Sequence, residues 1–392
     1  MTRLDFELIR RLLPDWVRLR QDIHAHPELG FQEHRTAEIV ANCLREWGYE
    51  VHTGIGGTGV VGVLQGDLPG SERSIGLRAD MDALPIQEKT DLPYQSKHER
   101  IMHACGHDGH TTILLGAAQY LASTRAFSGR VVLIFQPAEE GLGGAQAMLE
   151  DGLFTRFPCD EIYALHNWPG LPPDVIGVNP GPMMAAADEF DIVVYGQGGH
   201  GAHAYQTVDP IVIAAQVINA LQTVVARNVP AMDAAVITVA AIKAGTIQAR
   251  NVIPDQAQLS GTVRTFKAET QALVQTRMQS VLDGIAQAYD AKIEMTYRCL
   301  FPATINHVPQ AQKVARIATE LLGPNQVQCP FTPSMGAEDF SYMLQVCPGA
   351  YFRLGQGGAE QGRVLHNAMF DFNDDVIATG VAMFAALVQD GA

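Results

Sequence analysis

The sequence lacks the features that mark secreted, membrane-spanning and nucleic-acid-binding proteins. Only six cysteines occur in 392 residues, without a Cys-x-x-Cys pair, which is typical of reduced thiols in a cytoplasmic protein. The N-terminal segment has no signal-peptide apolar core, and no run of about 18 apolar residues predicts a membrane span. The 42 acidic residues outnumber the 27 lysines and arginines, and this net charge of −15 argues against nucleic acid or an anionic membrane as partner.

What remains is a globular chain, 47% hydrophobic, whose 392 residues favour two domains. Apolar segments typical of buried strands alternate with helical patterns, which predicts an α/β sheet with a substantial parallel part. We expect strands at residues 60–64, 74–77, 131–135, 161–165 and 350–354. We expect helices at residues 4–23, 33–47, 111–118, 145–151 and 375–389.

The pattern changes in the middle of the chain. Expected strands at 189–196, 235–242, 257–266 and 292–297 enclose expected helices at 209–228 and 269–289. The order βαββαβ is that of a ferredoxin-like sandwich. We therefore predict one domain made of residues 1–186 and 299–392, interrupted by an inserted domain of residues 187–298.

The densest group of polar side chains is His103-Ala-Cys-Gly-His-Asp-Gly-His110, directly before an apolar helical run. Other polar side chains fall at the ends of expected strands, where ligands bind in such sheets. The candidates combine one thiolate, one carboxylate and three imidazoles, a set that suits Zn²⁺ and also Mn²⁺, Co²⁺ or Ni²⁺. One bridging ligand with two more on each ion would suit a two-metal site. These candidates are Cys105, His107, Glu140, His166 and His366.

Glu139 and Glu140 follow a predicted buried strand, so one carboxylate could bind metal while its neighbour acts as a base. His103 and His110 are expected to be structural rather than ligands. Glu338 and Asp339 fit either an acidic helix start or a site role. The cysteines other than Cys105 are expected to be packing thiols, and His24 and His26 a polar cluster at a helix end.

With these motifs in view, the sequence resembles the metal-dependent aminoacylase, carboxypeptidase and dipeptidase family. It most resembles the amidohydrolase branch of hippurate hydrolases and indoleacetyl-amino-acid hydrolases. The matching motifs span nearly the whole chain: Arg78-Ala-Asp-Met-Asp-Ala-Leu-Pro85, His103–His110, Gln136-Pro-Ala-Glu-Glu140, Ala164-Leu-His-Asn167, Gly198-Gly-His-Gly-Ala202, Asn251-Val-Ile-Pro254, Gly336-Ala-Glu-Asp-Phe340 and Leu365-His-Asn367.

The resemblance implies a zinc-peptidase-like catalytic domain with two divalent ions per subunit, and an inserted domain that makes a homodimer or a tetramer. It implies hydrolysis of an N-acyl amino acid at its amide bond. Cys105 would bridge the ions, with His107 and His166 on one, and Glu140 and His366 on the other. The other implied roles are a general base on the bridging water (Glu139), a carboxylate that orients a ligand histidine (Asp82), an oxyanion donor from the partner subunit (His200) and contacts to the substrate carboxylate (Asn251, Arg264).

Three positions depart from the family pattern. Ala204, Tyr205 and Ala368 replace residues that are usually proline, histidine and proline, respectively. None of them is a ligand or the base, but the change at Tyr205 bears on substrate range. The alternatives are a dipeptidase or carboxypeptidase of the same family, or a binding protein that kept the fold without the chemistry.

Overall fold

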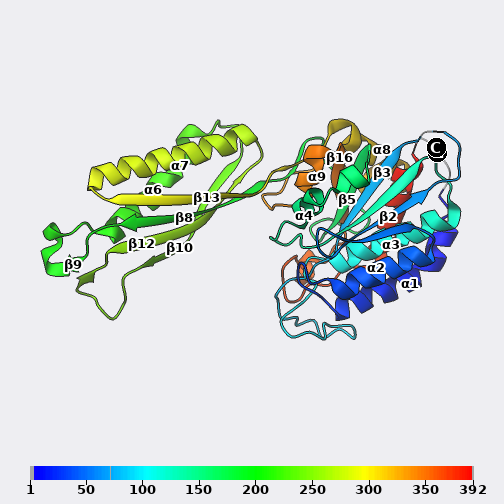
Figure 1. Ribbon diagram of the computed structural model, residues 1–392, viewed down its shortest axis with the longest axis horizontal. Helices are drawn as coiled ribbons and strands as arrows, with labels where there is room; N and C mark the ends of the chain where they lie inside the picture. Colours follow the sequence, from blue (N-terminus) through cyan, green and yellow to red (C-terminus); the bar gives the residue numbers. More distant parts are fainter. Residues whose placement is uncertain (1–3, 71, 391–392) are drawn as a thin grey trace. The chain divides into compact units, whose positions relative to one another are not determined.

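A computed structural model describes residues 4–70 and 72–390, which divide into two compact units. The first unit comprises residues 1–183, 305–333 and 339–392, and the second comprises residues 184–304 and 334–338. Figure 1 labels the elements of both units. The predicted inserted domain, residues 187–298, lies within the second unit.

The first unit is an α/β structure. Its helices are α1 (Phe6–Ala25), α2 (His34–Glu46), α3 (His107–Thr124), α4 (Gly144–Glu150), α5 (Leu153–Arg156), α8 (Val308–Leu322), α9 (Phe340–Val346) and α10 (Ile377–Gln389). Its strands are β1 (Glu50–Ile55), β2 (Gly59–Gln65), β3 (Ser74–Asp80), β4 (Arg130–Gln136), β5 (Glu161–Trp168), β6 (Ile176–Gly177), β15 (Val327–Gln328) and β16 (Gly349–Gly355). The short strands β7 (Pro182–Met184) and β14 (Thr304–Ile305) fall at the boundaries between the units.

Within the described residues, the first unit has one eight-stranded sheet in the order β1-β2-β4-β3-β5-β16-β6-β15. Strands β4, β3, β5 and β16 are parallel, which confirms the predicted sheet type. Every residue of β3 and β16 is buried, as expected for parallel strands covered on both faces. Helices α1, α3 and α10 contact one another, and the buried apolar side chains of α3 and α10 belong to the main core.

The parallel strands bring the polar motifs to one edge of the sheet. Strand β3 ends at Asp80 and β4 at Gln136, while β5 extends through His166 to Trp168, three residues beyond its predicted end. Helix α3 begins at His107, so the His103–His110 stretch lies at a helix N-terminus as predicted. The loops that carry the candidate ligands therefore meet at the carboxyl ends of the strands.

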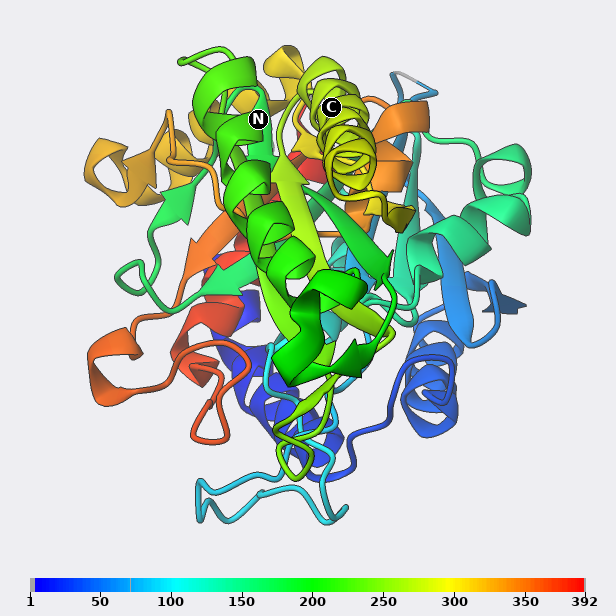
Figure 2. The same cartoon turned by 90° about the vertical axis from the view of Figure 1, so that its left-hand side faces the viewer.

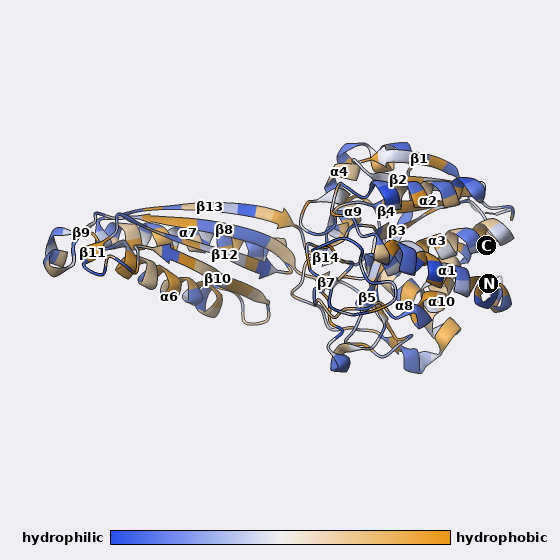
Figure 3. Ribbon diagram, turned by 90° about the horizontal axis from the view of Figure 1, so that it is seen from below, coloured by the Kyte–Doolittle hydropathy of each residue, from blue (hydrophilic) through white to orange (hydrophobic). Residues whose placement is uncertain are grey.

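The second unit has the expected βαββαβ order. Its elements are β8 (Ala186–Tyr195), β9 (Gly199–His200), the 3₁₀ helix η1 (Gly201–Gln206), α6 (Pro210–Asn228), β10 (Ala235–Ala244), β11 (Val252–Ile253), β12 (Gln256–Thr265), α7 (Ala268–Tyr289) and β13 (Lys292–Phe301). Its main sheet is antiparallel in the order β10-β12-β8-β13. Figure 2 shows α6 and α7 lying side by side across this unit, and Figure 3 shows the alternation of hydrophilic and hydrophobic residues along β13.

Helix α6 is long and apolar enough, by length and composition alone, to cross a membrane. Asp209 caps it by accepting a hydrogen bond from the Ile211 N–H, with Pro210 at the first position. Its inward face, including Ile213, Val217 and Leu221, packs in the core of the second unit. This burial accounts for the apolar residues of the inward face, whereas Ile211 and Val212 are exposed.

Some elements were not expected and one expectation is wrong. Helices α8 and α9 and several short strands were not expected, and neither was β1, whose residues alternate little in polarity and form an edge strand. The expectation that all five remaining cysteines are packing thiols is wrong for Cys299 and Cys329, whose side chains are exposed. Cys299 lies on the edge strand β13 and Cys329 follows the short strand β15, so neither belongs to a core strand.

Candidate metal centre

Cys105 and His107 are placed by the turn that starts α3. Gly106 lies between them with φ 93°, a left-handed conformation that glycine adopts without strain. A Cβ atom at this position would lie 2.5 Å from the Asn167 side-chain oxygen, so no larger residue fits. The turn brings Cys105 Sγ to 3.4 Å from Nε2 of His166 on β5. A glycine is thus required for the two α3-side ligands to meet the β5 ligand.

The five predicted metal ligands form two groups that share one atom. Cys105, His107 and His166 make the first group, and Cys105, Glu140 and His366 make the second. Within each group the candidate ligand atoms lie within 4.8 Å of one another. Glu139 forms a further group with His107 and Glu140. The sulfur of Cys105 is therefore the common point of two three-residue clusters.

One buried polar atom points to an ion in this cluster. Among the described residues, His107 Nε2 has no hydrogen-bond partner, while Glu140 Oε1 lies 3.2 Å from His366 Nε2. Buried polar atoms without partners are rare, and each usually has a functional or solvent explanation. A soft thiolate, a carboxylate and three imidazoles are suitable donors for divalent ions such as Zn²⁺. The donor set therefore fits a divalent metal site.

The charges of the cluster are mutually dependent. Burial and the nearby Glu140 carboxylate raise the pKa of the Cys105 thiol. Burial alone would lower the pKa of His107, but Asp80 and Cys105 raise it well above the usual value. Hydrogen bonds to Cys105 and Glu140 raise the pKa of His366 to about 10. Burial and the neighbouring His110 instead lower the pKa of His166. Divalent cations bound here would take the place of the protons on Cys105, His107 and His366.

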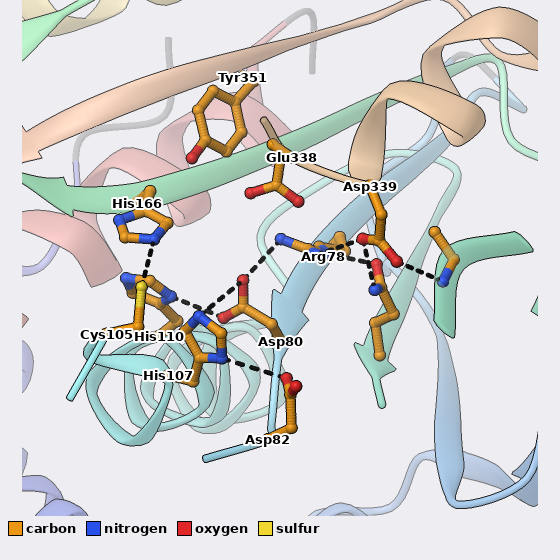
Figure 4. A network of polar contacts seen from close by, with 12 residues as sticks. Arg78, Asp80, Asp82, Cys105, His107, His110, His166, Glu338, Asp339 and Tyr351 are labelled. Atoms are coloured by element: carbon orange, nitrogen blue, oxygen red, sulfur yellow. Dashed lines mark hydrogen bonds and ion pairs between the residues drawn. The ribbon is translucent and has the colours of Figure 1, made fainter. Parts of the chain in front are cut away.

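Asp82 joins the two sides of the cluster. Its Oδ1 atom lies 3.2 Å from His107 Nδ1, and its Oδ2 atom accepts the Glu140 N–H at 2.9 Å. A carboxylate on Nδ1 fixes the proton there and leaves Nε2 as the donor atom for a metal. Figure 4 shows His107 between Asp82 and Asp80.

The loop that carries His366 is tied to the Cys105 turn. The His366 N–H donates to the carbonyl of Ala104 at 2.8 Å. His366 has φ 61°, an uncommon left-handed conformation for a residue other than glycine. Such strained residues concentrate at functional sites, where the surrounding structure holds them.

The remaining predicted site residues belong to the second unit. His200 in β9 and Asn251, directly before β11, are exposed neighbours, because β9 pairs with β11 and the Gly201 N–H donates to the Asn251 carbonyl. Arg264 lies near the other end of β12 and pairs with Val236 and Ala187. Eight residues separate Gln256, at the start of β12, from Arg264, a length of about 26 Å in a strand. One carboxylate cannot contact both Asn251 and Arg264 of the same chain.

Comparison with known proteins identifies the family. The model of peptidase family M20/M25/M40 matches residues 76–390. The chain belongs to this family. It is 44% identical over 373 residues to a hippurate hydrolase of Campylobacter jejuni, covering 95% of each protein.

Two further relatives place this M20-family chain among hydrolases. A thermostable carboxypeptidase of Saccharolobus solfataricus is 38% identical over 385 residues, which is 96% of this chain and 95% of the relative. A solved structure of a dinuclear metal-binding peptidase of the M20 family from Bacillus subtilis has a TM-score of 0.83 and 35% identity. The match covers 98% of this chain and 99% of that structure. The chain is accordingly an amidohydrolase-type enzyme that uses divalent metal.

Sequence reasoning missed a second layer of this M20-family site. Asp80 is fully buried and contacts Arg78 at 2.8 Å and His110 Nδ1 at 2.6 Å (Figure 4). His110 also lies 2.7 Å from the side-chain oxygen of Asn167, so its predicted structural role agrees with its contacts. Asp80 shares a motif with Arg78 and Asp82, and its position at a strand end was the signal that could have assigned it.

For Asp339, the sequence left open a choice between an acidic helix start and a role in the site. Asp339 stands at the N-cap of α9, but its side chain makes no capping hydrogen bond. Its carboxylate instead accepts hydrogen bonds from Gln136 Nε2 at 2.7 Å and from the Ala145 N–H at 2.9 Å. Asp339 therefore holds the segment that carries Glu139 and Glu140.

A buried ion-pair network lies beside the metal cluster. His24 is fully buried, with Nδ1 2.8 Å from Asp108 and Nε2 3.4 Å from Glu88. Arg20 contacts Asp108 and Asp374 at 3.5 and 2.7 Å. His103 is also buried, and burial lowers its pKa to about 4. His24 lies in the last turn of α1, so the expected polar cluster at this helix end is confirmed, and it is a buried ion-pair network.

Proposed function

We propose that the chain is a dinuclear hydrolase that cleaves the amide bond of an N-acyl amino acid. The observation that supports this most directly is the membership of Cys105 in both three-residue ligand groups. A single bridging thiolate with two further ligands on each side matches the composition of a two-metal site. The proposal assigns His107 and His166 to one ion, and Glu140 and His366 to the other.

The chain supplies a base next to these ligands. Two divalent ions at this site would supply Lewis-acid polarisation of the scissile carbonyl and activation of a water molecule. Glu139 adjoins His107 and Glu140 in one group, and only 8% of its surface is exposed. We assign to it the proton transfer from the attacking water to the leaving nitrogen, because a nearby carboxylate in a nearly dry site is suited to this step. Asp82 orients His107 and the Glu140 backbone.

An N-acyl amino acid as substrate is supported by the named activity of the hippurate hydrolase relative. With a net charge of −15, the protein needs a local cation to bind a carboxylate. Arg264 is the proposed cation, since it lies on a strand of the second unit where family motifs also occur. Asn251, which lies beside His200 at the opposite end of β12, is proposed as a second contact to the substrate carboxylate.

The separation of these residues favours a site built by two subunits. Since His200 and Asn251 lie at one end of β12 and Arg264 at the other, one substrate would take the first two from one subunit and Arg264 from its partner. Strands β10 and β13 are sheet edges among the described residues, and an edge can pair with a second copy. We therefore keep the predicted homodimer as part of the proposal, with His200 donating to the developing oxyanion.

Mixed dimers test this arrangement. His200→Ala should lower kcat about a hundredfold, because an oxyanion donor contributes roughly 3–4 kcal/mol to the barrier. Mixing His200→Ala with Glu139→Gln subunits gives one intact site per mixed dimer if His200 acts across the interface. Recovery of up to about half the activity is the expected result. Verified mixed dimers that stay inactive would show that His200 acts within its own chain or that no such dimer forms.

The carboxypeptidase relative keeps a second substrate class open for the same site. A panel of N-acetyl amino acids, N-benzoyl amino acids, dipeptides and longer peptides decides between the two classes, with Mn²⁺, Zn²⁺, Co²⁺ and Ni²⁺ each added to metal-free enzyme. We expect turnover of N-acyl amino acids that EDTA abolishes and a divalent ion restores. Full turnover by verified metal-free enzyme, or an acyl group covalently attached to Cys105, would refute the proposed chemistry.

A further inference from the structure

The segment between α1 and α2 makes close contacts with the turn that carries the proposed base. These residues lie between the helices expected at 4–23 and 33–47, and the sequence predicted no site role for them. The structure pairs Leu29 with Ala83, next to Asp82, and the Ala83 N–H donates to the Glu28 carbonyl at 2.8 Å. A Cβ atom on Gly30 would lie 3.0 Å from the Cβ and 3.1 Å from the Cα of Ala138. The segment therefore supports both the Asp82 loop and the Glu139 turn.

Glu33 ends this segment, and its side chain does not serve its own helix. It occupies the N-cap of α2, yet makes no side-chain capping hydrogen bond. The cap is supplied by Glu28, whose two carboxylate oxygens each accept a backbone N–H, from Arg35 and Thr36, at 2.9 Å. The Glu33 carboxylate is fully buried instead, and burial raises its pKa. Since burial of a carboxylate is unfavourable unless its oxygens are hydrogen-bonded, its partners indicate its role.

The partners of the Glu33 carboxylate are the hydroxyl of one side chain and a backbone N–H in the turn that carries Glu139. One oxygen of Glu33 accepts the Ala138 N–H at 2.8 Å, and the other accepts the Thr58 hydroxyl. Ala138 has φ 53°, a left-handed conformation that costs a non-glycine residue roughly 1–2 kcal/mol. The Glu33 carboxylate thus holds a strained residue directly before Glu139.

The carboxylate of Asp82 holds the backbone on the C-terminal side of Glu139. The Glu140 N–H donates to Asp82 at 2.9 Å, while the carbonyls of Ala138 and Glu139 accept from the N–H groups of Gly144 and Gly141. Asp82 therefore holds the peptide group directly after Glu139, and Glu33 holds the peptide group between Pro137 and Ala138, one residue before Glu139. The direction of the Glu139 side chain depends on these two backbone anchors.

From this geometry we infer that Glu33 is a positioning residue for the base Glu139, acting through the Ala138 peptide group. The inference rests on the proposed role of Glu139. Glu33 lies outside residues 76–390, the part that the family model matches. A misplacement of about 1 Å can lower a rate about a hundredfold, so loss of the Glu33 acceptor should reduce kcat by about 10- to 100-fold.

The test compares Glu33→Ala with Glu33→Gln. Glutamine keeps an oxygen for the Ala138 N–H, and its NH₂ group can donate to the Thr58 oxygen, so kcat should stay within about threefold of wild type. Glu33→Ala should lower kcat with KM and bound metal unchanged. Thr58→Val is the matched control, because it removes the other partner of Glu33 and leaves the Ala138 contact in place. Equal kcat for Glu33→Ala and wild type would overturn the inference, as would an equal loss in Glu33→Gln.

Two further measurements distinguish positioning from general loss of structure. If Glu33 acts only through Glu139, the double variant Glu33→Ala/Glu139→Gln should be no slower than Glu139→Gln alone. Independent, multiplying losses would contradict the inference. In metal-free protein, hydrogen exchange of the Ala138 amide should be faster in Glu33→Ala than in wild type and Thr58→Val, and equal rates would contradict it.

Gly30→Ala covers the case in which Glu33→Ala does not fold. The added methyl group should push on Ala138 and lower kcat while the Glu33 carboxylate remains, and unchanged kcat would count against the inference. The proposed function fails separately: wild-type enzyme that hydrolyses no N-acyl amino acid, or a fully active Glu139→Gln variant, would refute the function itself. A slow Glu139→Gln variant beside a fully active Glu33→Ala variant refutes only the role of Glu33.

Discussion

Two successive residues of α3, His107 and Asp108, face two buried polar clusters of different character. The Nε2 atom of His107 has no hydrogen-bond partner among the described residues and shares a cluster with Cys105 and Glu140. An oxygen of Asp108 instead lies 2.8 Å from His24 and 3.5 Å from Arg20. The first cluster gathers a thiol, a carboxylate and imidazoles whose candidate ligand atoms lie within 4.8 Å of one another in each group, whereas the second pairs one carboxylate with a histidine and an arginine.

The difference separates a site from a structural network, although both are buried. Buried ion pairs stabilise a particular arrangement when each charge has a partner, and removing one partner leaves an uncompensated charge. A thiol, a carboxylate and three imidazoles that converge on one point are instead a set of donors suited to a divalent cation. We therefore expect substitutions in the first cluster to affect chemistry or metal binding, and those in the second to affect stability.

The largest effect is expected at Glu139. Glu139→Gln keeps the size of the side chain but removes its basicity, so kcat should fall by about 10²–10⁴. Metal content, measured by plasma mass spectrometry, should stay at the wild-type value. Glu140→Gln is the matched control and should lose metal. If Glu139→Gln loses metal while Glu140→Gln keeps it, the two roles are reversed.

Substitutions in the cluster around Asp108 should lower the free energy of unfolding. Asp108→Asn removes the negative charge shared by His24 and Arg20, and breaking such a buried pair costs roughly 3–5 kcal/mol. Urea denaturation should show this loss, while kcat per folded, metal-loaded molecule stays near the wild-type value. A stable Asp108→Asn variant with a large loss of kcat would place Asp108 in the chemistry and contradict the division.

A pH dependence of stability follows from His24. Although burial alone would lower its pKa, Asp108 and Glu88 raise the pKa of His24 from 6.5 to about 9, with Arg20 opposing. The raised folded-state pKa means that this stabilisation is complete below about pH 6.5 and is lost as the pH rises through about 9. Its size is about 3 kcal/mol at 1.36 kcal/mol per pKa unit. The difference in unfolding free energy between wild type and His24→Gln should therefore shrink between pH 6 and 10; a constant difference would refute a charged His24.

The smallest effect is expected outside both clusters. Cys299→Ser and Cys329→Ser change exposed thiols, so the free energy of unfolding should stay within about 0.5 kcal/mol of wild type. Their kcat and metal content should equal those of wild type. Cys105→Ser, by comparison, should lose metal and activity. A matching loss of metal in Cys299→Ser would mean that the sequence-based choice among the cysteines was wrong.

The sequence predicted those parts of the structure that depend on local pattern. The alternation of buried strands and helices, the cap and proline that start α6, and the start of α3 near Cys105 all follow from a few neighbouring residues. The five ligands could be collected because each follows a recognisable strand or motif. The exposed thiols Cys299 and Cys329 were misjudged because edge strands resemble core strands in sequence.

The contacts that set the geometry were beyond sequence reasoning. Nothing local to Glu33 indicates a hydrogen bond to Ala138, 105 residues away. The network of Arg20, His24 and Asp108 likewise joins α1 to α3 across more than 80 residues. The length of β12 between the ends that carry Asn251 and Arg264 likewise comes from the strand register, and it leads to the proposal that one substrate meets these residues from two subunits.

The central claim is that Cys105 bridges two ions, and anomalous X-ray scattering from metal-loaded crystals tests it most directly. The account predicts two peaks about 3.5–4 Å apart, both within bonding distance of the Cys105 sulfur. His107 and His166 should ligate one ion, and Glu140 and His366 the other. A single fully occupied ion, or two ions without Cys105 as a shared ligand, would contradict it.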